Sequence, residues 1–259
     1  MKTAHDHKGE VSSYAILVHQ RGWAANHDGN VSVRLDKAGK LLITPTATSK
    51  RKCSPESIVL VESDGKPGGS GPRKGKPPGE LNLHMAAYQA RPDVHAVIHA
   101  HPPQASAFAL AARAIEPVAM PEVVVSLGDK IPLLPLFLPK DPRAPQAVAD
   151  ALAIADVMLL SGNGVLVVGS DLEQAFLRLE LLEHYARILA AAGPIGGPKP
   201  LDAAVIAQLL EQRRAAGLGP QTAAKPAAVV SKPTSIVPSA SSVRAVVEDE
   251  LKKALGGRR

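Results

Sequence analysis

The segment from Glu80 to His101 concentrates side chains that can bind a metal ion or carry a proton. It places one glutamate and four histidines in 22 positions, ELNLHMAAYQARPDVHAVIHAH. The alternation in VHAVIHAH is typical of a strand, so His99 and His101 are expected to leave the same face. Two imidazoles on one face near a strand end can chelate one divalent ion. Zinc is the natural candidate, because it accepts neutral imidazole nitrogen and carboxylate oxygen.

The element before this strand is predicted to be a helix over residues 80–91, and Glu80 opens it. The positive end of a helix dipole favours an ionised carboxylate at that position. His84 follows one turn later on the same helical face, and we interpret it as a structural residue beside the strand. His95 lies at the other end of the strand, so we interpret it as a surface or packing residue. A His-X-His strand alone is a weak metal signal, and the surrounding elements must add to it.

Those elements alternate between helical and strand patterns. We predict helices over residues 9–20, 80–91, 105–114 and 170–193, and strands within 30–35, 41–44, 54–66, 94–101 and 157–170. The last helix carries the clearest signals, with Ser170 and Glu173 as a capping box and Gly193 as its end. Its core face is predicted to consist of Leu172, Phe176, Leu179 and Leu182. The order predicts an α/β or α+β fold, with a single central β-sheet flanked by helices, in one domain covering residues 1–215.

The composition narrows the classes of function. A chain of 259 residues that is 45% hydrophobic can bury one substantial core. Its net charge is +6, but only 3% of its residues are aromatic, so platforms for stacking on nucleic acid are scarce. It has no uninterrupted apolar run of about 18 residues and no secretory signal. The single Cys53 fits a reducing compartment. We therefore expect a cytoplasmic protein that binds neither nucleic acid nor membrane.

Four stretches, in this order, resemble the class II aldolase/adducin family. They are GNVSVR (29–34), LLITPT (41–46), the histidine-rich segment (80–101) and LLSGNGVLVVGSDLEQA (159–175). The likeness covers about residues 9–192 and is greatest to the L-fuculose 1-phosphate aldolase branch of that family. It implies a homotetramer with zinc sites at the subunit boundaries.

The resemblance also implies roles for particular side chains. His99 and His101 would be zinc ligands, and Glu80 would be both a resting ligand and the acid/base group. The positions that would hold a substrate phosphate are Asn30, Thr44 and Thr46. The implied reaction cleaves a ketose 1-phosphate, such as fuculose or rhamnulose 1-phosphate, to dihydroxyacetone phosphate and lactaldehyde. Zinc would stabilise the enediolate as a Lewis acid while Glu80 carries the proton.

The sequence departs from the family pattern at four positions. Asn163 stands where the family has its third histidine ligand, and offers a carbonyl oxygen as a weaker candidate ligand. Pro78-Gly79 replaces a serine pair, Ala47 replaces a glycine, and Met120 falls where the aldolase has a tyrosine proton donor. Three interpretations stay open: an aldolase, a relative that decarboxylates or epimerises a sugar-acid phosphate, and a scaffold that kept the fold and lost its metal.

The C-terminal region has a different composition. Residues 216–240 are rich in Ala, Pro, Ser and Lys without periodicity, which predicts a flexible linker. An amphipathic helix is predicted over residues 241–256, with an apolar stripe of Val243, Val246, Val247, Leu251 and Leu255. A helix this short is marginal alone in water, so the stripe needs a partner. The segment resembles the encapsulation peptides of bacterial microcompartment cargo, which implies docking on shell proteins and a location in the lumen of such a compartment.

Overall fold

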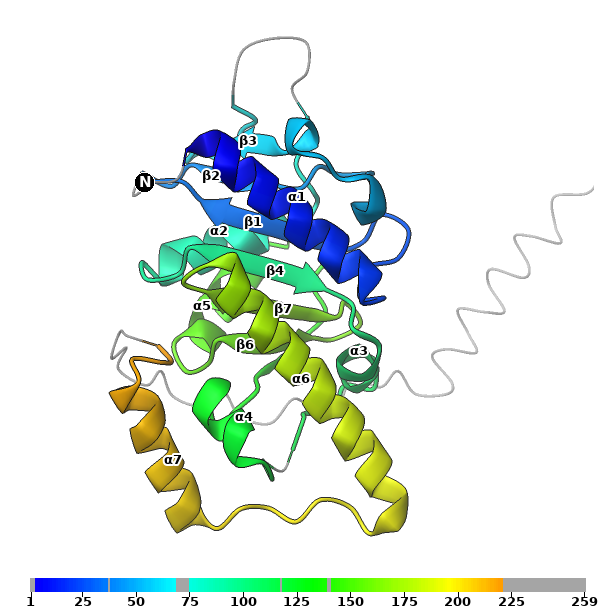
Figure 1. Cartoon of the computed structure of the whole chain (residues 1–259), viewed down its shortest axis with the longest axis vertical. Coiled ribbons are helices and arrows are strands. Elements are labelled where there is room, and N and C mark those ends of the chain that lie inside the picture. The colour runs from blue at the N-terminus through cyan, green and yellow to red at the C-terminus, as the bar shows by residue number, and fades with distance from the viewer. Residues whose placement is uncertain (1–2, 37, 69–74, 117, 139–140, 221–259) are drawn as a thin grey trace, which may run out of the picture. The chain divides into compact units, whose positions relative to one another are not determined.

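The computed structural model describes residues 3–36, 38–68, 75–116, 118–138 and 141–220, and these residues build one mixed sheet flanked by helices (Figure 1). The seven described strands follow the order β3-β2-β1-β4-β7-β6-β5. They are β1 (Asn30–Arg34), β2 (Leu41–Ile43), β3 (Val59–Val61), β4 (Ala96–Ala100), β5 (Leu133–Leu134), β6 (Val157–Leu160) and β7 (Val165–Gly169). Neighbours are antiparallel except β5 and β6, which are parallel. The predicted single central sheet flanked by helices is confirmed.

Helices cover both faces of the sheet. On one face lie α1 (Ala4–Gln20), α3 (Pro103–Leu110), α4 (Pro121–Ser126) and α6 (Leu172–Ala192). On the other face lie α2 (Leu81–Ala90) and α5 (Ala144–Leu152), while α7 (Ala203–Ala215) packs against α4. Because side chains alternate along β4, Ile98 belongs to the first core and Val97 to the second. His99 therefore faces the α2 side of the sheet.

The start of α6 corrects one prediction. Its N-cap is Asp171 and not Ser170, because the Asp171 carboxylate accepts a hydrogen bond from the Gln174 N–H at 2.7 Å. Glu173 bonds to the Tyr14 hydroxyl and does not complete a capping box. The helix ends at Gly193 as predicted. The four residues predicted for its core face are all buried, namely Leu172, Phe176, Leu179 and Leu182.

Several elements are longer or more numerous than the sequence pattern indicates. Helix α1 begins five residues before the predicted residue 9, because Thr3 and Asp6 form a capping box ahead of it. Helices α4, α5 and α7 and the two-residue strand β5 were not predicted. Among the described helices, none is both long and apolar enough to cross a membrane.

A buried ion cluster fastens four parts of the chain together. Asp156, just before β6, has no exposed surface, and its carboxylate oxygens lie 3.1 Å from Arg91, 2.9 Å from Arg178 and 2.6 Å from Arg213. Arg91 also donates to the Gly219 carbonyl at 3.4 Å. The three arginines come from the end of α2, from α6 and from α7, so one carboxylate joins these helices to the sheet. Ordered packing reaches at least Gly219.

The described residues all belong to the first of the chain's two units, Met1–Lys225. The predicted linker beyond residue 220 and the predicted helix over 241–256 lie outside the described residues.

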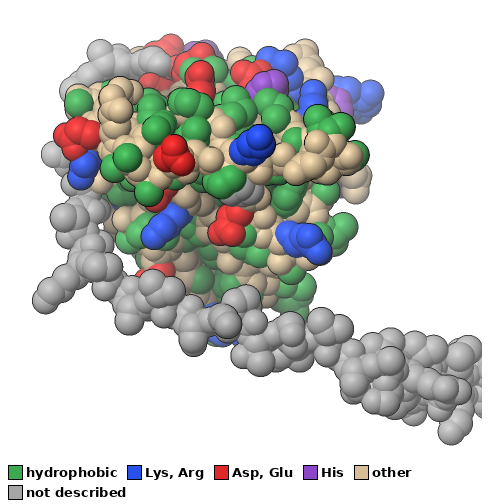
Figure 2. Space-filling view, turned by 90° about the horizontal axis from the view of Figure 1, so that it is seen from below, with side chains coloured by type: hydrophobic (Ala, Val, Ile, Leu, Met, Phe, Trp, Pro, Cys, Tyr) green, Lys and Arg blue, Asp and Glu red, His purple; other side chains and the backbone are tan. Residues whose placement is uncertain are grey.

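The first unit carries exposed apolar side chains. Seen from below, hydrophobic side chains cover much of that face, with single acidic and basic side chains between them (Figure 2). The large apolar side chains that are more than half exposed are Leu110, Leu136, Leu138, Ile154, Leu177 and Ile195.

Candidate active site

His99 on β4 and His101 just after it direct the same ring nitrogen, Nε2, at each other. Their Nε2 atoms are 3.3 Å apart, and the rings meet edge to face with centroids 5.1 Å apart. His99 is 1% exposed, and its Nδ1 lies 2.9 Å from the carbonyl oxygen of Val165 on β7. A carbonyl only accepts, so Nδ1 carries the proton and Nε2 of His99 presents a lone pair. We call His99 and His101 the histidine pair.

The geometry of the histidine pair fits a zinc ion. Two nitrogen ligands at about 2.0–2.1 Å in tetrahedral coordination lie about 3.3–3.4 Å from each other. The observed separation is 3.3 Å. Burial, and then the neighbouring His101, lower the pKa of His99 to about 3, so its imidazole is neutral at pH 7. A neutral, oriented imidazole is the form that binds a metal.

The β6–β7 turn packs directly on the second histidine. Gly164 has φ +69, and a Cβ atom built there would lie 2.3 Å from the Ala100 carbonyl oxygen and 3.0 Å from the His101 ring. Only glycine therefore fits between the turn and the ring. The preceding Asn163, the predicted weak ligand, lies in the same turn and lines a cavity of about 340 Å³ with both histidines.

Glu80, the predicted acid/base group, also lines this cavity. It is the N-cap of α2 and makes no side-chain capping hydrogen bond. Glu80 and Asn163 also line an adjoining cavity of about 200 Å³, so both stand where the two spaces meet. The structure thus brings Glu80, His99, His101 and Asn163 to one cavity. Among the described residues, however, no three His, Cys, Asp or Glu side chains are close enough to hold a metal together.

The residues expected to hold phosphate divide into two groups. Thr46 and Asn30 line the cavity, and Asn30 lies opposite His99 in the β1–β4 register. The Asn30 amide nitrogen donates to the Gly29 carbonyl at 2.6 Å, while its buried oxygen has no hydrogen-bond partner within the described chain. Thr44 is fully buried, and its hydroxyl accepts a hydrogen bond from the Val31 N–H at 3.2 Å. It therefore joins the segment after β2 to β1.

The strand-end loop after Thr46 shows why the family pattern has glycine there. Ala47 has φ +52, in the left-handed region that L-residues with a Cβ avoid. Ala47 therefore adopts a backbone conformation that suits glycine better than alanine. Ala47 lines the cavity together with Pro78 and Gly79, which stand where the serine pair was expected.

Two charged residues at the site were not found from the sequence. Lys50 is 3% exposed, and its Nζ donates to the His27 and Thr48 carbonyls, both at 3.2 Å. Burial lowers the pKa of Lys50, against the raising effects of Cys53, Asp28 and Glu80. Asp28 lines the cavity, and its Oδ2 lies 3.8 Å from Nδ1 of His101. Neither had a sequence signal, since Lys50 begins an ordinary basic run, KRK.

His84, His95 and Met120 do not line the histidine-pair cavity. His84 is fully buried, and its Nδ1 is 2.7 Å from the Ser32 hydroxyl, as expected for a structural histidine. His95 is exposed. Met120 is the N-cap of α4 and packs against the core. No tyrosine lines the histidine-pair cavity in the part of the chain described here.

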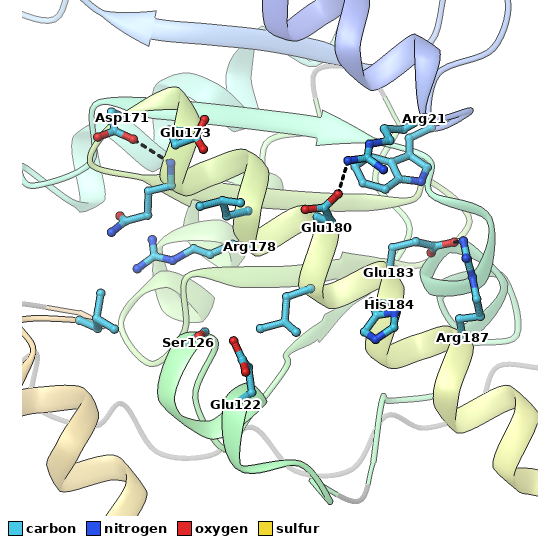
Figure 3. Close-up of a pocket in the computed structure, with 15 residues that line it drawn as sticks. Arg21, Glu122, Ser126, Asp171, Glu173, Arg178, Glu180, Glu183, His184 and Arg187 are labelled. Carbon is cyan, nitrogen blue, oxygen red and sulfur yellow. Dashed lines mark hydrogen bonds and ion pairs between the residues drawn. The ribbon is translucent and has the colours of Figure 1, made fainter.

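A larger cavity lies elsewhere, along α6 (Figure 3). Its volume is about 770 Å³, and most of its charged groups are engaged in structural contacts. Arg21 pairs with Glu180 at 2.5 Å. Glu183 accepts from the Gln104 and Ala105 N–H groups at 3.0 and 2.9 Å, and so caps α3. This space has no converging set of metal-binding nitrogens, and we place the chemistry at the histidine pair.

Fold and site together define an α/β protein with two converging imidazoles and a carboxylate beside the end of the central strand of a mixed sheet. The model of the Class II Aldolase and Adducin N-terminal domain matches residues 9–190. The chain belongs to the class II aldolase/adducin family.

Named relatives carry two different activities. The 3-oxo-tetronate 4-phosphate decarboxylase of Escherichia coli K12 is 32% identical over 190 residues, covering 71% of this chain and 86% of the relative. The L-fuculose phosphate aldolase of the same strain is 33% identical over 192 residues, covering 73% and 86%. A solved structure of a putative aldolase/epimerase/decarboxylase from Escherichia coli superposes with a TM-score of 0.72 at 30% identity, covering 81% of this chain and all of the other.

Proposed function

We propose that this protein is a metal-dependent carbon–carbon lyase acting on a small phosphorylated sugar or sugar acid. The observation that carries the proposal is the 3.3 Å separation of the two Nε2 atoms above a cavity that Glu80 also lines. A bound divalent metal such as zinc would supply Lewis-acid stabilisation of negative charge on the substrate. His99 and His101 would hold it, with Glu80 or Asn163 as the further oxygen donor.

Two reactions lead to the same product in such a site. Aldol cleavage of fuculose or rhamnulose 1-phosphate releases lactaldehyde, whereas a 3-oxo sugar acid 4-phosphate releases carbon dioxide. In both, the electron pair of the broken carbon–carbon bond stays with the three-carbon fragment as the enediolate of dihydroxyacetone phosphate. One proton added to carbon then completes the reaction, and we assign this proton transfer to Glu80, which lines the cavity.

The two reactions differ in the protons that must move. Aldol cleavage requires a base to take the hydroxyl proton of the carbon that becomes the aldehyde, whereas decarboxylation of a 3-oxo acid requires none. No tyrosine of the described chain lines the cavity, and Met120, expected at the position of the aldolase proton donor, cannot transfer a proton. This observation favours decarboxylation, and aldol cleavage is the second candidate.

The substrate is tested by comparing the two classes of phosphate on one preparation. Fuculose 1-phosphate, rhamnulose 1-phosphate and 3-oxo-tetronate 4-phosphate are each incubated with the protein, and dihydroxyacetone phosphate is measured with a coupled dehydrogenase. We expect turnover of the 3-oxo acid, loss of turnover in Glu80→Gln, and little effect in Glu122→Gln. Turnover of the ketose phosphates alone would select the aldolase, and turnover of none would oppose both.

The metal is tested by elemental analysis of the purified protein. We expect about one zinc or other divalent ion per chain, and its loss in His99→Ala. The exposed His95→Ala serves as the matched control and should keep the metal. A protein without metal, whose melting temperature does not rise on zinc addition, would support the scaffold interpretation.

We also propose that the C-terminal region directs the protein into a bacterial microcompartment through docking of residues 241–256 on shell proteins. The apolar stripe in the sequence supports this, because an amphipathic helix gains order when the stripe is buried in a groove. Deletion of 221–259 keeps the Arg91–Gly219 hydrogen bond. The shortened protein should keep its oligomeric state and lose co-localisation with shell, and unchanged packaging would disprove the role of the tail.

A further inference from the structure

The loop between α1 and β1 brings a carboxylate to the outer side of the histidine pair. Gly29 has φ +71, and a Cβ atom there would lie 3.0 Å from the His99 carbonyl oxygen, so the loop runs close against β4. Asp28 precedes this glycine, and its N–H donates to the Ala25 carbonyl at 3.0 Å. The close approach at Gly29 therefore sets the distance from Asp28 to the His101 ring.

The Nδ1 atoms of both histidines face an oxygen, but only that of His99 is at hydrogen-bonding distance. On its Nδ1 side, His99 meets the Val165 carbonyl at 2.9 Å, and His101 meets the Asp28 carboxylate at 3.8 Å. On their Nε2 sides the two rings face each other. A metal-binding histidine commonly directs its second nitrogen at a carbonyl or carboxylate, which fixes the tautomer and makes the ligand more basic. Asp28 stands in that place for His101.

His101 can carry its proton on either ring nitrogen, whereas the Val165 carbonyl holds the proton of His99 on Nδ1. Nε2 of His99 carries a lone pair, so without a metal the 3.3 Å contact is a hydrogen bond in which Nε2–H of His101 donates. To bind a metal, His101 must release that proton from Nε2 and carry one on Nδ1. A carboxylate beside Nδ1 favours that tautomer, because it attracts the proton and the positive charge that a metal ligand gains.

The second oxygen of Asp28 strengthens the assignment. Asp28 Oδ1 is buried and has no hydrogen-bond partner within the described chain. An anionic oxygen kept without partners is costly unless its charge serves a neighbouring cation. The ammonium of Lys50 binds the carbonyl of His27, the residue before Asp28, and so holds this loop against the cavity.

We propose that Asp28 is a positioning residue for the metal centre, which holds His101 in the Nδ1–H tautomer and strengthens it as a ligand. This inference rests on the proposed metal-dependent function. A carboxylate behind His101 would offset part of the affinity lost where Asn163 stands in place of an imidazole.

The test measures zinc affinity by competition with a chromophoric chelator, independently of activity. Asp28→Asn keeps the shape and removes the charge, and we expect zinc to bind about 10- to 100-fold more weakly. Asp36→Asn is the control, since Asp36 is exposed in the β1–β2 turn and should leave the affinity unchanged. Asp28→Ser gives the same readout if Asp28→Asn lowers the melting temperature.

A second readout follows the tautomer itself. Imidazole nitrogen NMR of the zinc-free protein should show a larger Nε2–H population for His101 in Asp28→Asn than in the unmodified protein. Equal zinc affinity of Asp28→Asn and the unmodified protein would overturn this inference and leave the proposed function standing. Absence of zinc binding in the unmodified protein would instead overturn the proposed function.

Discussion

At the scale of single residues, the site combines groups that backbone contacts hold in place. The His99 ring is fixed by a carbonyl, the His101 ring is covered by Gly164, and Lys50 binds two carbonyls. Such contacts leave few rotamers open, so ring nitrogens keep their direction before any ligand arrives. Substitutions near the site should therefore alter local backbone strain and proton binding, while the shape of the sheet stays the same.

Ala47, whose backbone is left-handed in the loop after β2, offers a direct test of backbone strain near the site. Replacing Ala47 by glycine removes a left-handed alanine, which we expect to raise the free energy of unfolding by about 1 kcal/mol after the greater entropy of the unfolded glycine is subtracted. Urea denaturation measures it. Ala112→Gly is the matched control, with φ +50 at the end of α3. Both should stabilise the protein, but only Ala47→Gly should change KM, and a loss of stability in Ala47→Gly would contradict the strain.

Acid sensitivity should come in part from His84. Burial, with a smaller effect from His99, lowers the pKa of His84 to about 3, below the ordinary value of 6.5. The unfolded chain therefore binds a proton that the folded chain refuses. This contribution to stability is fully present above pH 6.5 and is lost as the pH falls towards 3, at about 1.4 kcal/mol per pH unit.

The non-titrating variant His84→Gln should flatten that dependence. We expect the slope of the unfolding free energy between pH 5.5 and pH 4 to fall by about 1.4 kcal/mol per pH unit, as measured by urea denaturation at several pH values. The exposed His95→Gln is the control and should keep the original slope. An unchanged slope in His84→Gln would mean that the folded protein already accommodates a charged His84.

At the scale of elements, the Asp156 cluster is the main polar link between helices and sheet. Replacing Asp156 by alanine leaves three buried guanidinium groups, from Arg91, Arg178 and Arg213, without this carboxylate. We expect a loss of about 3–5 kcal/mol of unfolding free energy. Asp150→Ala on the exposed side of α5 is the control and should cost little. A small loss in Asp156→Ala would show that water or rearranged carbonyls replace the carboxylate.

The elements also show how far sequence patterns reach. The alternation of VHAVIHAH predicted β4 and placed His99 and His101 on one face, which the structure confirms. Helix α4 and strand β5 are too short for a pattern to mark them, and α7 carries little periodicity. Helix α5 is amphipathic, with Ala144, Val148 and Leu152 on its buried face, so its pattern was present in the sequence and was missed. The roles of Asp28 and Lys50 could not be predicted, because both depend on segments that only the folded chain brings together.

At the scale of the whole molecule, the exposed leucines beside the site indicate a subunit contact. Leu136 and Leu138 are 54% and 70% exposed, and both line the cavity that Glu80 and Asn163 share. Apolar side chains at the edge of a polar cavity suit burial by another copy of the chain. This arrangement agrees with the predicted oligomer and with a site at a subunit boundary, which remain predictions.

The oligomer prediction can be tested with a charge at this edge. Leu138→Glu should shift the protein towards smaller species in light scattering, since a carboxylate would be buried without a partner in the interface. Ile195→Glu is the control, because Ile195 is 86% exposed and lies after α6, away from the cavity residues. An unchanged mass for Leu138→Glu would place the interface elsewhere.

The hydrogen bond from His99 to Val165 has a consequence for how this family can diversify. Its acceptor belongs to the main chain of β7, so every amino acid at position 165 supplies it equally well. The orientation of the His99 ring in the proposed metal site is therefore insensitive to the side chain at position 165 as long as β4 and β7 stay neighbours. The His101 ring relies instead on the side chain of Asp28, which a single codon change can erase. Descendants of this scaffold should therefore lose or retune metal affinity through the His101 side first.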